Sequence, residues 1–176
     1  MLIIYTGNGK GKTSACVGQA LRALGRGFTV FFAQFMKSRD VAGEQLMLGR
    51  LLGDDFYCNG KGFYRGGAEE FTKHRAAAEE TLAWALSRLA ALQGSAPAPG
   101  RMLILDEALY ALNHDLLTEM ELRTIIKLCR AQGVHLVLSG RGLPAWLAEE
   151  ADLISEIQEI KHPLQAGIKA GEGIEF

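Results

Sequence analysis

The sequence has few of the features that assign a chain to a special class of protein. Its three cysteines, Cys16, Cys58 and Cys129, are odd in number and have no paired spacing, which argues against a disulfide framework or a zinc site. We interpret them as small buried apolar side chains and expect a reducing, cytoplasmic location. No apolar run approaches the roughly 20 residues of a membrane-spanning helix, so we expect no membrane segment.

The sequence also has no large excess of positive or of negative charge. The formal net charge is −1 at pH 7, which gives no support to binding of nucleic acid or of a membrane surface as the main activity. The 176 residues are enough for a proper core, and we expect one domain over residues 1–176. Because the chain begins with an apolar, strand-like run, no signal peptide is expected.

The motif around which the chain is organised is a glycine-rich turn. Residues 2–5 are an apolar run typical of a buried strand, and residues 15–24 have apolar side chains at helical spacing. Strand, glycine-rich turn and helix in this order predict a phosphate-binding P-loop, because backbone N–H groups and the helix dipole point at one place. Lys12 adds a positive charge, and the Thr13 hydroxyl can ligate Mg²⁺. The residues expected to bind the nucleotide here are Gly7, Asn8, Gly9, Lys10, Gly11, Lys12, Thr13 and Ser14.

One position departs from the general P-loop pattern. That pattern has glycine five residues before Gly11, where this chain has Thr6. Gly7 and Gly9 then supply the flexibility of the loop, so we expect the nucleotide to be held differently from that of a standard ATPase. The alternative, an ordinary glycine-rich turn without a ligand, is disfavoured by Gly-Lys-Thr at the start of a helix.

A pair of acidic residues is the second chemical landmark. Asp106 and Glu107 end the strand-like residues 101–107, of which residues 102–105 are apolar. This arrangement (Walker B) puts carboxylates beside the Mg²⁺ of a P-loop. Thr13, Asp106 and Glu107 are therefore the expected metal ligands, although in an ATPase Glu107 would instead activate water. Arg141 follows the strand-like residues 134–138, at the edge where open α/β sheets bind ligands, and is either a phosphate clamp or a solvated loop arginine.

The remaining patterns predict an α/β fold, with a mostly parallel central sheet of about five or six strands flanked by helices. Apolar residues 28–34 favour a central strand covered on both faces. The glycine-rich residues 59–67 carry Phe63, which is either a substrate contact or the apolar anchor of a surface loop. The other expected elements are helices over 43–52, 69–93 and 118–130, a short helix from Pro144, a short strand in 54–58, an edge strand over 153–160 and a connector over 94–100.

With these motifs in view, nearly the whole chain resembles the P-loop type of corrinoid adenosyltransferase, which acts on cob(I)alamin or cob(I)yrinic acid a,c-diamide. The resemblance covers residues 5–13, 103–107 and 139–141, and residues 34–37 with Gly43 and Glu44 also fit. Its most specific part is the tail, because no generic NTPase needs Lys161-His162-Pro163 followed by residues 167–170 and 173–174. The Thr6 that breaks the general pattern belongs to this family's version of the loop.

The resemblance implies transfer of the 5′-deoxyadenosyl group of ATP to the cobalt of a reduced Co(I) corrinoid, with release of triphosphate, in adenosylcobalamin biosynthesis or salvage. It implies Mg²⁺ held by Thr13 and Glu107, an ATP that lies in the loop in the reverse of the usual sense, and a homodimer. A flavoprotein is a candidate reductant. The matching stretches also add Glu44, Lys161 and His162 to the residues expected to bind ATP or the corrinoid.

The chemistry of such a transfer needs no general base, because Co(I) is itself a strong nucleophile. The protein must hold the reactants in line and neutralise charge on the departing triphosphate, for which the expected catalytic residues are Lys12, Thr13, Glu107 and Arg141. By resemblance, Phe63 would crowd the lower face of the cobalt and favour loss of its axial ligand. The family's usual Thr-Trp after Gly-Phe is here Tyr64-Arg65, so we expect this step either to rely on Phe63 and Tyr64 or to be less efficient. The N-terminal helix that some members have before the first strand is not expected.

Two other functions remain open on the residues alone. One is a generic P-loop ATPase or small-molecule kinase, in which ADP would form. The other is a nucleotide-gated protein that delivers a corrinoid without modifying it.

Overall fold

The computed structural model describes residues 1–39, 41–92 and 99–174. Within them, six strands form one sheet in the order β3-β2-β4-β5-β1-β6, and each of its pairings is parallel. The strands are β1 (Leu2–Thr6), β2 (Thr29–Gln34), β3 (Phe56–Cys58), β4 (Arg101–Asp106), β5 (His135–Ser139) and β6 (Leu153–Glu156). The predicted fold class is thereby confirmed.

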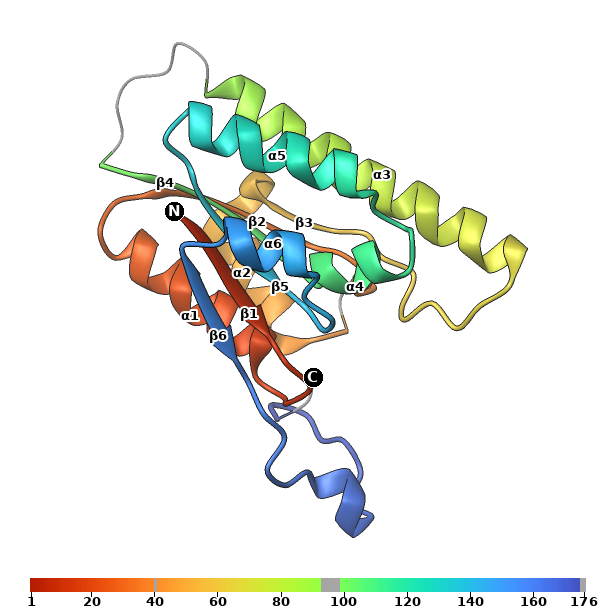
Figure 1. Ribbon diagram of the computed structural model, residues 1–176. Helices are drawn as coiled ribbons and strands as arrows, with labels where there is room; N and C mark the ends of the chain where they lie inside the picture. Colours follow the sequence, from red (N-terminus) through yellow and green to blue (C-terminus); the bar gives the residue numbers. More distant parts are fainter. Residues whose placement is uncertain (40, 93–98, 175–176) are drawn as a thin grey trace.

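Helices cover both faces of the sheet (Figure 1). Successive side chains of a strand point to opposite faces, so the apolar strands supply two cores. Ile4, Phe31 and Leu105 pack under helices α3 to α6, whereas Ile3, Phe32 and Ile104 pack under α1 and α2. The helices are α1 (Lys12–Leu24), α2 (Gly43–Leu52), α3 (Ala68–Ala91), α4 (Ala108–Asn113), α5 (Glu119–Ala131) and α6 (Ala145–Glu150), with 3₁₀ turns η1 (Gly53–Asp55) and η2 (Pro163–Ala166).

Most of the expected elements are present at nearly their expected positions. β2 lies between β3 and β4 with five of its six residues buried, as a central strand should. Thr118 and Glu121 form the predicted capping box at the start of α5. The three cysteines are buried and unpaired, as predicted. Residues 93–98, where the end of the long helix and most of the connector were expected, lie outside the described residues.

One prediction of local structure was wrong, and one helix was missed. The edge strand expected over residues 153–160 ends at Glu156, because its partner β1 ends at Thr6 and the Ile157 carbonyl instead accepts a hydrogen bond from the Gly9 N–H (2.7 Å). All four residues of β6 are exposed, so the alternation of apolar and polar residues in this segment does not correspond to one buried and one exposed face. Helix α4 was not predicted, since its six residues are too few to show a helical period.

The topology brings three strand ends together at one edge of the sheet. β5 lies between β1 and β4, and the carboxyl ends of these parallel strands are Ser139, Thr6 and Asp106. The loop after β1 and the acidic pair after β4 therefore meet. The tail beyond β6 projects past this same edge, and its end returns beside the loop (Figure 1), where the Lys10 ammonium donates to the Ile174 carbonyl.

Candidate active site

The glycine-rich loop is shaped by the chain segment that packs on it. A Cβ at Gly7 would lie 2.4 Å from the Ile157 carbonyl oxygen, and one at Gly9 would lie 2.7 Å from the Gln158 backbone. Both positions therefore require glycine for close approach, and Gly7 also has a φ of 100°. Thr6, by contrast, is an ordinary strand residue paired with Glu156. The residue that departs from the general P-loop pattern, Thr6, is thus the last residue of β1, and its backbone conformation does not require glycine.

The Lys12 side chain is folded across the loop. It is only 6% exposed, and its ammonium donates to the carbonyls of Gly7 and Gly9, both at 2.8 Å. Burial lowers the pKa of Lys12, while nearby Glu107 acts in the opposite direction. Arg141, in the loop after β5, reaches the same region and donates to the Asn8 carbonyl (3.2 Å). Two cations thus lie at the mouth of the loop.

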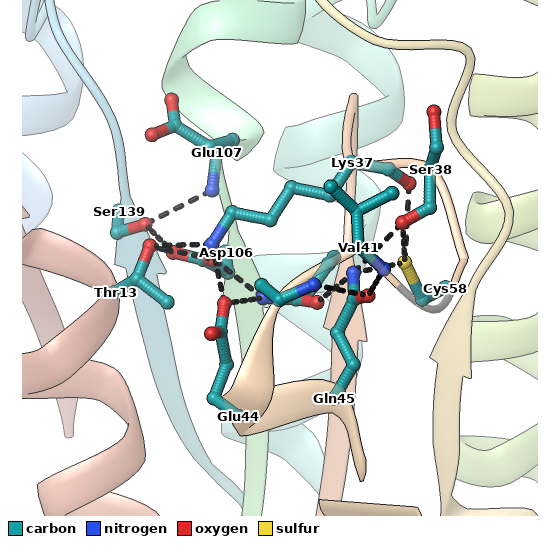
Figure 2. A network of polar contacts seen from close by, with 12 residues as sticks. Thr13, Lys37, Ser38, Val41, Glu44, Gln45, Cys58, Asp106, Glu107 and Ser139 are labelled. Atoms are coloured by element: carbon teal, nitrogen blue, oxygen red, sulfur yellow. Dashed lines mark hydrogen bonds and ion pairs between the residues drawn. The ribbon is translucent and has the colours of Figure 1, made fainter. Parts of the chain in front are cut away.

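The Asp106 carboxylate is the centre of a buried polar network (Figure 2). The Thr13 hydroxyl lies 3.0 and 3.2 Å from its two oxygens, the Gln34 amide donates at 3.1 Å and the Ser139 hydroxyl donates at 2.6 Å. Lys37 adds an ion pair at 3.3 Å. Residues from α1, β2, the loop after β2, and β5 are therefore tied together through one fully buried carboxylate.

Lys37 joins this network to Glu44. Its ammonium lies 2.9 Å from the Thr13 hydroxyl oxygen and 2.9 Å from a carboxylate oxygen of Glu44. Burial works against the charged ammonium, but Asp106 and Glu44 outweigh it and raise the pKa of Lys37. Burial likewise works against the Glu44 carboxylate, and the bond and charge of Lys37 nevertheless lower the pKa of Glu44.

Glu107 has an uncommon backbone conformation for a residue with a side chain. Its φ is 60° and its ψ is 21°, and it caps the start of α4. The Ser139 hydroxyl accepts its backbone N–H at 2.9 Å, which holds this strained turn in place. The Glu107 carboxylate points away from the Asp106 cluster (Figure 2). Burial, assisted by the charge of Asp106, raises the pKa of Glu107.

Oxygen donors at this edge suit Mg²⁺, which prefers one or two carboxylates completed by substrate phosphates. Thr13, Glu44 and Asp106 supply a hydroxyl and two carboxylates around a single point, the Lys37 ammonium. In the described part of the chain, no group of three or more His, Cys, Asp and Glu side chains is placed to hold a metal by itself. The residues therefore fit a magnesium ion that arrives with a phosphate ligand.

These groups face an open pocket of about 1040 Å³. One part of its wall is polar and is formed by the loop, Lys37, Glu44, Glu107 and Arg141. Another part is aromatic: Phe63 is 59% exposed and its ring meets the edge of Tyr110 at 5.3 Å between centroids. This exposure does not fit the alternative in which Phe63 anchors a surface loop.

The predicted site residues are not all brought to this pocket. Those that line it are Asn8, Gly9, Lys10, Gly11, Lys12, Thr13, Ser14, Glu44, Phe63, Glu107, Arg141 and His162. Gly7 lies against Ile157, and Asp106 lies beneath Thr13. Tyr64 turns away from the pocket to contact Phe71, His74 and His114, and Lys161 is exposed in the tail.

Sequence reasoning missed four members of the site. Gln34, Lys37 and Ser139 bind the buried Asp106 carboxylate, and Tyr110 lines the pocket from α4. Three of them lie within residues 34–37 and 139–141, which match the family but to which the sequence assigns no role. A polar residue at the carboxyl end of an apolar strand was the available signal for Gln34 and Ser139.

Comparison with known proteins agrees with this geometry. A model of the protein family described as "ATP:corrinoid adenosyltransferase BtuR/CobO/CobP" matches residues 1–176. The chain belongs to this family. Proteins named corrinoid adenosyltransferase from Sinorhizobium sp, Pseudomonas aeruginosa and Escherichia coli are 33%, 35% and 32% identical to it, over all of this chain and 80%, 83% and 85% of their own lengths.

Membership of the ATP:corrinoid adenosyltransferase family decides between the functions left open by the residues. The protein is an enzyme that transfers an adenosyl group from ATP to a corrinoid, in cobalamin biosynthesis. A generic P-loop ATPase or kinase is not favoured. In the residues described, no helix combines the length and the apolar character needed to cross a membrane.

Proposed function

We propose that this adenosyltransferase joins C5′ of ATP to the cobalt of a Co(I) corrinoid and releases triphosphate as an intact unit. Co(I) donates an electron pair to C5′, the C5′–O bond breaks, its electron pair stays on the triphosphate oxygen, and the cobalt becomes Co(III). The observation that carries the proposal is a single pocket with a phosphate-binding loop on one part of its wall and, on another, the exposed ring of Phe63 packed against the partly buried ring of Tyr110.

The loop is the part suited to the leaving group. Lys12, Arg141 and the N-terminal N–H groups of α1 can neutralise the charge that develops on triphosphate. The Lys12 ammonium is bonded to the Gly7 and Gly9 carbonyls, and it must exchange those bonds for phosphate oxygens when ATP binds. Lys10, whose ammonium bonds Ile174 in the tail, is a weaker contributor.

We assign Mg²⁺ to Thr13 and Asp106, with Glu44 beside them at the same point. Glu107 is a further carboxylate that would have to turn towards the ion. When bound, the ion would neutralise triphosphate charge and fix the geometry of the phosphates. The Thr13 hydroxyl donates to Asp106 at 3.0 Å, which leaves its oxygen lone pairs directed elsewhere and available to a cation. Asp106 therefore orients Thr13, and Glu107 lies at the start of α4, on the wall of the same pocket.

The aromatic wall suits the corrinoid. A corrinoid ring is large and largely apolar at its faces, and Phe63 offers an exposed ring at the pocket. We therefore propose that ATP lies with its phosphates in the loop and C5′ towards Phe63, the reverse of the usual sense. Tyr64 contributes through its backbone, which Tyr110 holds, and His162 and Lys161 contribute from the tail.

The proposal also covers the oligomeric state of the enzyme and the source of the electron that reduces the cobalt. We propose that residues 1–176 form one domain that works as a homodimer, in keeping with the family resemblance. A separate flavoprotein is our candidate for supplying the electron that converts Co(II) to Co(I).

Product analysis tests the proposed reaction. With ATP, Mg²⁺ and chemically reduced cobalamin under anaerobic conditions, we expect triphosphate by phosphorus NMR and a light-sensitive adenosylated corrinoid in equal amounts. Thr13→Ala should lose turnover while it still binds the corrinoid. Formation of ADP or steady release of orthophosphate without corrinoid would contradict the proposal.

A further inference from the structure

The Lys37 ammonium occupies the point where the oxygen donors of the site converge. It lies 2.9 Å from the Thr13 hydroxyl oxygen, 2.9 Å from Glu44 and 3.3 Å from Asp106 (Figure 2). These three groups come from α1, α2 and β4. They are also oxygen ligands of the kind that a divalent cation takes.

The buried carboxylate beneath this point needs a positive charge. Asp106 is 0% exposed, and Gln34 and Ser139 give it neutral hydrogen bonds only. A buried carboxylate without a cation is costly, and removing one partner of a buried pair is strongly destabilising. Among the ion pairs of the described residues, the partner of Asp106 is Lys37.

The backbone that carries Lys37 is held in place, so any displacement of its ammonium would come from rotation of the side chain. Met36 has a φ of 60° and its carbonyl accepts the Gly62 N–H at 2.6 Å. The Lys37 carbonyl accepts from the Cys58 thiol at 3.1 Å. The side chain itself lines the open pocket. Rotation about its own bonds can therefore withdraw the ammonium from the carboxylates without moving the backbone, once another cation takes its place.

We propose that Lys37 is a resident cation that fills the metal position of the nucleotide-free enzyme and is displaced when the metal arrives with ATP. Lys37 is thus a positioning residue: it keeps Thr13, Glu44 and Asp106 in their ligating arrangement and makes free Mg²⁺ a poor competitor. The inference rests on the proposed metal site. It implies that metal and nucleotide enter together, because the phosphates supply the extra ligands needed to displace an ammonium.

The test is metal binding by the full chain without nucleotide or corrinoid. Mn²⁺, used in place of Mg²⁺, can be titrated by electron paramagnetic resonance into wild-type enzyme and Lys37→Met, which keeps the length of the side chain and removes its charge. We expect Lys37→Met to bind Mn²⁺ at least ~10-fold more tightly than wild type. Lys73→Met is the matched control, because it breaks an exposed pair with Glu69 on α3, and it should bind like wild type.

Thermal unfolding gives a second measurement. If Lys37 had only a structural role, Mg²⁺ would not restore the Tm that Lys37→Met loses. Without metal, Lys37→Met should unfold several degrees below wild type, and Mg²⁺ should restore much of the difference by binding the folded state. Should Lys37→Met fail to fold even with Mg²⁺, Lys37→Gln takes its place in both measurements. Equal Mn²⁺ affinity in wild type and the neutral variant would overturn the inference. It would leave the triphosphate reaction untouched, since that is measured by its products.

Discussion

The Tyr110 hydroxyl donates a hydrogen bond of 3.0 Å to the backbone carbonyl of Tyr64, the residue that follows Phe63. The Tyr110 ring also meets the Phe63 ring at 5.3 Å and the His114 ring at 4.3 Å. Helix α4 therefore supports the segment that carries the exposed Phe63. This contact links the turn at Glu107, where α4 begins, to the aromatic wall of the pocket.

Tyr110→Phe removes this hydrogen bond and keeps the ring. Since one hydrogen bond contributes roughly 0.5–1.5 kcal/mol, we expect the KM for the corrinoid to rise by about 3- to 10-fold, with little change in the KM for ATP. Steady-state kinetics with each substrate varied in turn measure this. Tyr57→Phe is the control, because its hydroxyl meets Glu80 outside the pocket. An equal rise in both KM values would show that Tyr110 does not act through the corrinoid side.

Activity should depend on the hydroxyl group of Thr13 and much less on its methyl group. Thr13→Ala removes the group that bonds Asp106 and that we assign to Mg²⁺, and kcat should fall by about 100-fold or more. Thr13→Ser keeps the hydroxyl and should keep most of the activity. Turnover at saturating ATP and Mg²⁺ measures the difference. Similar activity in both variants would remove Thr13 from the metal site.

Gly9→Ala should weaken ATP binding because a methyl group there would lie 2.7 Å from the Gln158 backbone. Residues 157–158 would have to separate from the loop, and the bond from the Gly9 N–H to the Ile157 carbonyl would lengthen. Gly49→Ala is the control: it lies in α2 with open space at its Cβ, and alanine there should stabilise by up to ~1 kcal/mol. ATP titration calorimetry and thermal unfolding test the pair, and an unchanged ATP affinity in Gly9→Ala would contradict this packing role.

The ion pair between Arg75 and Glu121 predicts a pH dependence of stability. The hydrogen bond from Arg75 lowers the pKa of Glu121 to about 2, from 4.5. Because the folded pKa is depressed, the stabilisation is complete above pH 4.5 and is lost as the pH falls towards 2. The difference in Tm between wild type and Glu121→Gln should therefore be largest near pH 7 and shrink between pH 4.5 and 2. Glu119→Gln, which breaks an exposed ion pair with Arg123, should show a smaller difference in Tm. A difference in Tm for Glu121→Gln that grows as the pH falls would contradict this prediction.

Local patterns were sufficient to predict much of the architecture. The apolar run that became β2, the capping box of Thr118 and the glycine-rich turn are local, and each is set by the neighbours along the chain. The role of Lys37 depends on three elements that are distant in sequence, and no local pattern reports it. The end of β6 could not be predicted for a similar reason. The Ile157 carbonyl accepts a hydrogen bond from the N–H of Gly9, a residue distant in sequence, and so does not continue the sheet.

The direction of ATP in the pocket tests the central claim most directly. A crystal structure with Mg²⁺, ATP and a Co(II) corrinoid should have the triphosphate against Lys12 and Thr13, and C5′ turned towards Phe63 within reach of the cobalt. No water should lie in line behind the terminal phosphorus. An ATP that lies in the usual sense, with such a water held by Glu107, would contradict the account.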